Sequence, residues 1–238
     1  NYIISYKNNI INQRVSSNYL KDRIQDSNLS FLIGFPRSGT TLLDNILSSH
    51  PKIEVIEEKP LISNLEKYIT DELNIKLDNL YKLSDNNIMI LRKKYFESVK
   101  KYTNKKSNII IDKLPLNTIT LPLINILFPN AKIIFTLRHP YDTVLSCFQQ
   151  SFRPNSAMRN LVSLKSSSIM YDQVMNAWDI YKNNLSLSFI RSKYENLIED
   201  FDNHTLKILE FLDIEWDANI KNYRKTALER VKINTPSS

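Results

Sequence analysis

The sequence predicts an α/β domain in which a central parallel sheet carries helices on both faces. Short apolar runs alternate with amphipathic segments, and polar or charged residues follow the ends of those runs. The chain has 238 residues, 42% of them hydrophobic and 24% charged, which suits one well-packed domain. We assign residues 1–28 to a lead-in helix or linker and residues 29–238 to the folded domain.

Four apolar runs have the length and composition of buried strands, namely residues 29–33, 108–111, 131–137 and 187–194. Apolar residues at helical spacing predict the helices between them, around residues 43–47, two or three within 60–106, around 121–127, from 141, over 169–183 and over 204–212. We expect residues 152–160 to form a loop. Ligands of parallel sheets bind outside the carboxyl ends of the strands, so the residues that follow the strands are the candidates for chemistry.

The only two glycines of the chain, Gly34 and Gly39, lie in one eight-residue stretch, Gly34-Phe35-Pro36-Arg37-Ser38-Gly39-Thr40-Thr41. Their spacing is that of the P-loop, G-x-x-x-x-G-K-[ST], and the stretch connects a predicted strand to a predicted helix. Backbone N–H groups of such a loop converge on a phosphate, so we predict a P-loop-containing nucleotide-binding fold. Thr40 replaces the P-loop lysine and Arg37 supplies a cation three residues earlier, which disfavours triphosphate hydrolysis.

A second candidate anion site follows the run 131–137. Arg138 comes directly after that run, and Ser146 lies on the helix that begins near Tyr141. A guanidinium group binds a phosphate through two parallel hydrogen bonds, and a serine hydroxyl adds another donor. Taken alone, Arg138 fits an ion-pair partner and Ser146 a residue of the helix surface equally well.

Charge and composition narrow the function classes. The net charge of +7 fits either an anionic ligand or a lysine-rich surface. The lysines are scattered rather than gathered with aromatic residues, so we expect no nucleic acid as a partner. No apolar run approaches the roughly 20 residues of a membrane span, so we expect none. The single cysteine, Cys147, together with the absence of a secretory leader, favours a cytoplasmic location.

Together these stretches resemble the two donor-binding motifs of sulfotransferases that use 3′-phosphoadenosine-5′-phosphosulfate (PAPS). The resemblance is strongest to the bacterial group often found behind tetratricopeptide repeats, which is related to protein-tyrosine sulfotransferases. Further matching stretches are Asp112-Lys113-Leu114-Pro115, Phe152-Arg153-Pro154-Asn155, Tyr194-Glu195-Asn196-Leu197 and Phe211-Leu212-Asp213-Ile214-Glu215-Trp216. It implies PAPS as co-substrate, with the 5′-phosphosulfate at the first motif, the 3′-phosphate at the second and no required metal.

The resemblance also implies roles for single residues. Donor-binding residues are expected at Pro36, Arg37, Ser38, Gly39, Thr40, Thr41, Arg138, Ser146 and Tyr194. Glu58 matches the general base, with Glu57 as the second choice, and Ser237 matches a serine that helps to hold the transferred group. Arg37 and Lys113 follow strand ends, so we expect their charges to act where a metal acts in phosphoryl transfer.

The expected activity is sulfuryl transfer to an acceptor hydroxyl, which belongs to a peptide tyrosine, a glycan or a small molecule. Glu54-Val55-Ile56 replaces the Arg-Cys-Gly of the tyrosine enzymes, which leaves the acceptor open. The alternatives are a P-loop nucleotide or small-molecule kinase and a non-catalytic nucleic-acid-binding domain. The family pattern continues beyond residue 238, so we expect a C-terminal truncation, and we consider a homodimer as the assembly.

Overall fold

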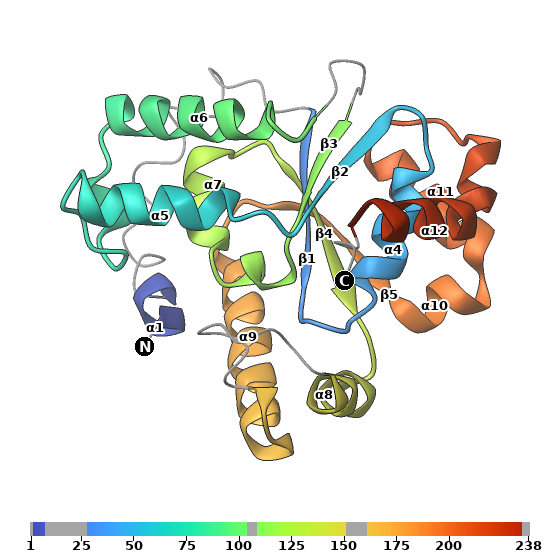
Figure 1. Cartoon of the computed structure of the whole chain (residues 1–238). Coiled ribbons are helices and arrows are strands. Elements are labelled where there is room, and N and C mark those ends of the chain that lie inside the picture. Colours follow the sequence, from blue (N-terminus) through green and yellow to red (C-terminus); the bar gives the residue numbers. More distant parts are fainter. Residues whose placement is uncertain (1, 8–27, 104–108, 151–160, 235–238) are drawn as a thin grey trace.

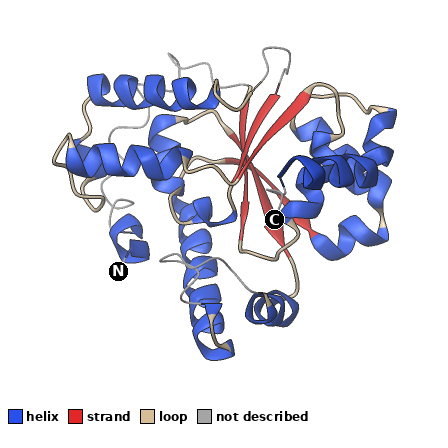
Figure 2. Ribbon diagram, viewed as in Figure 1, coloured by secondary structure: helices blue, strands red, loops and turns tan. Residues whose placement is uncertain are grey.

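A computed structural model of the chain describes residues 2–7, 28–103, 109–150 and 161–234. Its centre is a five-stranded parallel sheet with the strand order β2-β3-β1-β4-β5, drawn in red in Figure 2. The strands are β1 (Leu29–Gly34), β2 (Ile53–Glu57), β3 (Ile109–Lys113), β4 (Lys132–Leu137) and β5 (Ser188–Lys193). The predicted parallel sheet and its four predicted strands are thus confirmed, each within one or two residues at its ends.

The central strand, β1, is buried along its whole length, because its neighbours β3 and β4 pair with it on both sides. The register places Leu32 opposite Lys113 and Gly34 opposite Thr136. The loop that follows β1 therefore begins between the carboxyl ends of β3 and β4, where the sheet topology predicts a ligand.

Five of the described helices cover one face of the sheet, on the left in Figure 1: α1 (Tyr2–Lys7), α5 (Leu61–Asp71), α6 (Asp85–Val99), α7 (Leu121–Leu127) and α9 (Leu164–Asn184). Their apolar side chains form the larger hydrophobic core, in which Phe135 of β4 stacks on Trp178 of α9 at 3.8 Å between ring centroids. Tyr6 of α1 is buried in the same core, and its hydroxyl donates to Glu66 of α5.

Helices α4 (Thr40–Ser48), α10 (Tyr194–Glu199), α11 (Phe201–Phe211) and α12 (Tyr223–Asn234) lie on the other side, and α8 (Pro140–Gln149) lies below the sheet in that view (Figure 1). Short 3-10 turns occupy Leu80–Lys82, Pro115–Thr118 and Ala218–Asn222. A second core of α4 and α11 residues packs on this face, which confirms the prediction of helices on both faces. Every described helix is too short or too polar to cross a bilayer.

The edge strand β2 was not predicted. Within this strand Ile53 and Ile56 are buried but lie three positions apart, so its five residues lack the period-2 alternation that announces a half-buried strand. In the structure β2 pairs with β3, and the register sets Glu57 opposite Lys113. This pairing brings Glu57 and Glu58, the two glutamates that come after α4 in the chain, to the same sheet edge as Lys113.

Candidate active site

The stretch from Gly34 to Thr41 forms a tight loop between β1 and α4, and both glycines are required there. A Cβ on Gly34 would stand 2.3 Å from Oγ1 of Thr136 on β4. Gly39 has φ of +101° and caps α4, and a Cβ there would stand 2.9 Å from Cδ2 of Tyr194. The first turn of α4, which begins with Thr40, has N–H groups without partners inside the helix, so the loop is built to receive an anion.

Some of the other residues of this loop contact the rest of the fold, and others are exposed to solvent. Ser38 is buried, and its hydroxyl lies 2.6 Å from that of Thr136, so it fixes the loop to the sheet. The carbonyl of Pro36 accepts a hydrogen bond from Sγ of Cys147 at 3.2 Å. Thr40 is buried, whereas Thr41 is exposed at the start of α4. These predicted donor-binding residues therefore lie together in one loop.

Backbone strain marks two of the predicted catalytic residues. Among the described non-glycine residues, positive φ occurs at Arg37 (68°), Glu58 (50°), Asn74 (53°) and Asp213 (59°). Asparagine and aspartate tolerate this region, but arginine and glutamate rarely adopt it. Such strain clusters at functional sites, where the surrounding structure holds it. At Glu58 the backbone N–H donates to the carbonyl of Lys113 at 2.8 Å, which holds the turn after β2.

The second predicted anion site lies beside the loop. The guanidinium of Arg138 stacks on the ring of Tyr194 at 4.7 Å, and the same ring touches Gly39. Nε of Arg138 is buried and makes no hydrogen bond within the described residues, with the Asp142 carboxylate 4.0 Å away. A buried donor without a partner is costly, so this arginine is suited to an incoming anion.

A direct hydrogen bond joins the two predicted anion sites. Nε of Arg37 in the loop donates to Oγ of Ser146 on α8 at 3.0 Å. The next residue, Cys147, is buried against the loop, and burial raises the pKa of its thiol to about 12. Helix α8 is thus docked on the loop, and Arg37 and Arg138 lie on the same side of the sheet edge.

Lys113 is the centre of a cluster of charged residues at the end of β3. Its Nζ lies 3.0 Å from Glu58, 3.1 Å from Glu57 and 3.7 Å from Asp44 of α4. Burial alone would lower the pKa of this fully buried lysine, but the three carboxylates outweigh burial and raise it. Lys113 is therefore a fixed cation next to the candidate base. In the described part of the chain, no group of three or more His, Cys, Asp or Glu could hold a metal ion.

The histidines have structural contacts. His50 bridges two loops, because its Nδ1 accepts from the N–H of Lys52 at 3.1 Å and its Nε2 lies 3.0 Å from the carbonyl of Glu215. His204 lies 2.9 Å from the hydroxyl of Ser192, and burial lowers its pKa.

Three residues near the predicted site were not found from the sequence. Asp44 and Arg230 form ion pairs behind Lys113, and Glu195 accepts from the backbone N–H of His139 at 2.8 Å. These contacts join residues 56 to 186 positions apart, so no local pattern announces them. Ser237, together with the matching stretch 152–155, lies outside the described residues.

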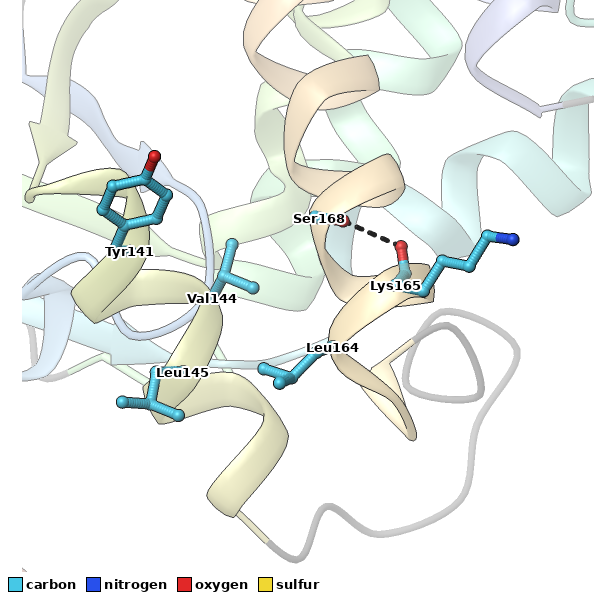
Figure 3. A pocket seen from close by; sticks show the side chains of 6 residues that line it. All are labelled: Tyr141, Val144, Leu145, Leu164, Lys165 and Ser168. Atoms are coloured by element: carbon cyan, nitrogen blue, oxygen red, sulfur yellow. Dashed lines mark hydrogen bonds between the residues drawn. The ribbon is translucent and has the colours of Figure 1, made fainter.

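A separate hollow of about 390 Å³ lies between α8 and α9 (Figure 3). Tyr141, Val144 and Leu145 line it from α8, and Leu164 lies opposite them on α9 with Lys165 and Ser168. Its lining is mainly apolar, and none of the predicted site residues belongs to it. The predicted site residues thus lie at the sheet edge, apart from this groove.

Comparisons with known proteins show the family to which this chain is similar. The Sulfotransferase family matches residues 30–218 of this chain. An uncharacterised protein of Aquifex aeolicus is 27% identical over 82% of this chain, and the protein-tyrosine sulfotransferase of Drosophila melanogaster is 25% identical over 83%. The sulfotransferase domain of the Synechococcus olefin synthase has a similar fold, with a TM-score of 0.53, 20% identity, and coverage of 82% of this chain and 76% of that one.

The chain spans 27% of the length of the Aquifex protein and 40% of that of the Drosophila enzyme. The family match covers most of the chain, including the loop after β1, the end of β3 and the turn between β4 and α8. These are the segments that carry Arg37, Lys113 and Arg138. This chain belongs to the sulfotransferase family.

Proposed function

We propose that this chain transfers a sulfuryl group from PAPS to an acceptor hydroxyl, with a peptide tyrosine as the acceptor. The observation that carries the proposal is the 3.0 Å hydrogen bond between Arg37 and Ser146, because it joins two anion sites that are 109 residues apart. A donor with phosphates on both its 5′ and 3′ oxygens needs two such sites at one sheet edge. A nucleoside triphosphate, whose phosphates form one chain, needs only the loop.

Each end of the donor has a matching set of groups. The N–H groups at the start of α4 and the guanidinium of Arg37 suit the 5′-phosphosulfate. Arg138 and Ser146 suit the 3′-phosphate, and the Arg37 contact with Ser146 would open to let both bind. The ring of Tyr194, which already stacks on Arg138, suits the adenosine part of the donor.

The transfer itself needs a base and a concentration of positive charge. The acceptor oxygen attacks sulfur while the bond from sulfur to the 5′-phosphate oxygen breaks, and adenosine 3′,5′-bisphosphate leaves. Glu58, which is 55% exposed, takes the acceptor proton, and Ser237 helps to hold the transferred group. Lys113 and Arg37 stabilise the negative charge that spreads over the sulfuryl and leaving oxygens.

The choice of acceptor is supported by the Drosophila relative, which is named a protein-tyrosine sulfotransferase. Glycans and small phenols remain the competing acceptors, since residues 54–56 differ from the tyrosine enzymes. Labelled PAPS offered to tyrosine peptides, glycans and phenols tests the point. Transfer to a glycan or a phenol, with none to the peptides, would overturn the tyrosine assignment and leave sulfuryl transfer intact.

Donor binding is tested by thermal unfolding with adenosine 3′,5′-bisphosphate in the absence of metal. We expect stabilisation of about 2.7 kcal/mol at a hundredfold excess of ligand over its Kd. Arg138→Ala should abolish this stabilisation because the 3′-phosphate loses its bidentate partner. Arg191→Ala, an exposed arginine on the neighbouring strand β5, should retain it. Stabilisation by MgATP with no response to the bisphosphate would instead favour a kinase.

A further inference from the structure

Helix α12 lies across α4 and next to β2, far from the predicted donor motifs in sequence (Figure 1). It carries Arg230, whose guanidinium group reaches two carboxylates. Nη1 and Nη2 donate to Oδ1 and Oδ2 of Asp44 at 2.6 and 3.2 Å, and Nη2 also donates to Oε2 of Glu57 at 3.2 Å. One arginine thus joins the helix behind the phosphate loop to the strand that precedes the candidate base.

The same carboxylates also contact Lys113. Oε1 of Glu57 accepts from Nζ of Lys113 while Oε2 accepts from Arg230, so Glu57 bridges the two cations. Three carboxylates, those of Asp44, Glu57 and Glu58, therefore share two cations, which leaves one net negative charge. Asp44 and Lys113 have no exposed side-chain surface, so their charges are poorly screened.

We propose that Arg230 is a positioning residue for sulfuryl transfer: it holds Asp44 and Glu57 and offsets one of their two negative charges, so that Lys113 remains directed at Glu58 and the transferred group. This inference rests on the proposed function. Within the described residues Glu58 forms an ion pair with Lys113 alone, whereas Asp44 and Glu57 each have Arg230 as well. Arg230 therefore divides the cluster into a supporting group of three, Arg230 with Asp44 and Glu57, and a working pair, Lys113 with Glu58.

Removal of Arg230 would change the balance of the cluster. The buried carboxylate of Asp44 would lose its bidentate partner, and Lys113 would be drawn from 3.7 Å toward it. The net charge beside the transferred group would change from one negative to two. Negative charge there weakens binding of the anionic donor and destabilises the negative charge that develops in the transition state. The second effect is the one that lowers kcat.

Three variants test the inference: Arg230→Ala, Arg230→Ala/Asp44→Asn, and Arg224→Ala as a control on the same helix. Arg224 is exposed and donates to the hydroxyl of its neighbour Tyr223, away from the cluster, so its removal should leave transfer unchanged. We expect Arg230→Ala to lower kcat at least about tenfold with a smaller change in donor KM. The double variant has the net charge of the wild type in the cluster, so it should recover most of kcat.

This recovery distinguishes a positioning role from a merely structural one. If Arg230 served only to attach α12 to α4, the double variant would still lack that attachment and would not regain kcat. Thermal unfolding of each variant establishes that it is folded. A wild-type kcat in Arg230→Ala, or no recovery in the folded double variant, overturns this inference and leaves the proposed function standing. A wild-type chain that transfers no sulfuryl group from PAPS to any acceptor overturns both.

Discussion

At the scale of single residues, two adjacent glutamates at the end of β2 lie in different surroundings. Glu57 has one oxygen on Lys113 and the other on Arg230. Partial burial would raise its pKa, but the attraction of Lys113, helped by Arg230, outweighs burial and lowers it. A carboxylate so held is a weak base, whereas Glu58 uses one oxygen for Lys113 and is 55% exposed. The contacts therefore favour Glu58 as the group that receives the acceptor proton.

We predict that Glu58→Gln lowers kcat by about 10²–10⁴-fold, the usual contribution of a general base. Binding of adenosine 3′,5′-bisphosphate should be unchanged, because Glu58 contacts neither anion motif. Glu57→Gln is the matched comparison, and its loss of kcat should be smaller. The measurement is steady-state transfer together with calorimetric binding. A larger loss in Glu57→Gln would exchange the two roles.

The side chains of the site were predicted unevenly. Arg37, Arg138 and Lys113 follow strand ends, where the sheet topology alone gathers functional groups. The strained backbone of Glu58 depends on the pairing of β2 with β3, which no short pattern reveals. Arg230 was missed because its contacts with α4 exist only after the chain has folded.

At the scale of elements, the loop between β1 and α4 depends on its two glycines for different reasons. Gly34 lies against the backbone and side chain of Thr136, so a Cβ there would clash with the sheet itself. Gly39 lies against the ring of Tyr194, which is a side chain and can move. Because both glycines of the chain lie in this loop, the loop was the strongest indication of a binding site in the sequence. The short edge strand β2 lacked any such signal, since its five residues show no alternation of buried and exposed positions.

We predict that Gly39→Ala weakens bisphosphate binding at least about tenfold while the protein remains folded. Alanine at φ of +101° is strained by about 1–2 kcal/mol, and its Cβ would displace the Tyr194 ring from the donor site. Gly34→Ala should instead reduce thermal stability, because the contact with Thr136 involves backbone atoms. Calorimetry and thermal unfolding of both variants distinguish the two effects. Unchanged bisphosphate affinity in Gly39→Ala would show that the loop does not contact the donor.

At the scale of the whole molecule, the sheet has α4 on one face and α6 on the other, and consecutive residues of β3 point to these two faces. Lys113 points into the cluster with α4, whereas its neighbour Asp112 lies on the other face among the side chains of α6. Alternation along a strand requires this division, so the sequence Asp112-Lys113 predicts opposite faces. What it does not predict is that Asp112 is fully buried, with the Tyr95 hydroxyl as its donor at 3.0 Å.

Burial of Asp112 makes the stability of the molecule depend on pH. Burial raises the pKa of its carboxyl from 3.8 to about 7, although the hydrogen bond from Tyr95 opposes the rise. Between those two values the folded chain keeps the proton and the unfolded chain releases it. The free energy of unfolding therefore falls as pH rises through this window, by at most about 1.4 kcal/mol per pH unit.

We predict that Asp112→Asn removes this contribution, because asparagine does not titrate. The variant's free energy of unfolding, minus that of the wild type, should rise from about pH 4 to about pH 7 and then level off. Tyr95→Phe should extend the wild-type decline to higher pH, because it removes the donor that lowers the pKa of Asp112. Urea unfolding at half-unit pH steps measures both effects. A difference between Asp112→Asn and wild type that stays constant across this range would mean that Asp112 is ionised in the folded chain throughout, with a counter-charge that compensates its burial.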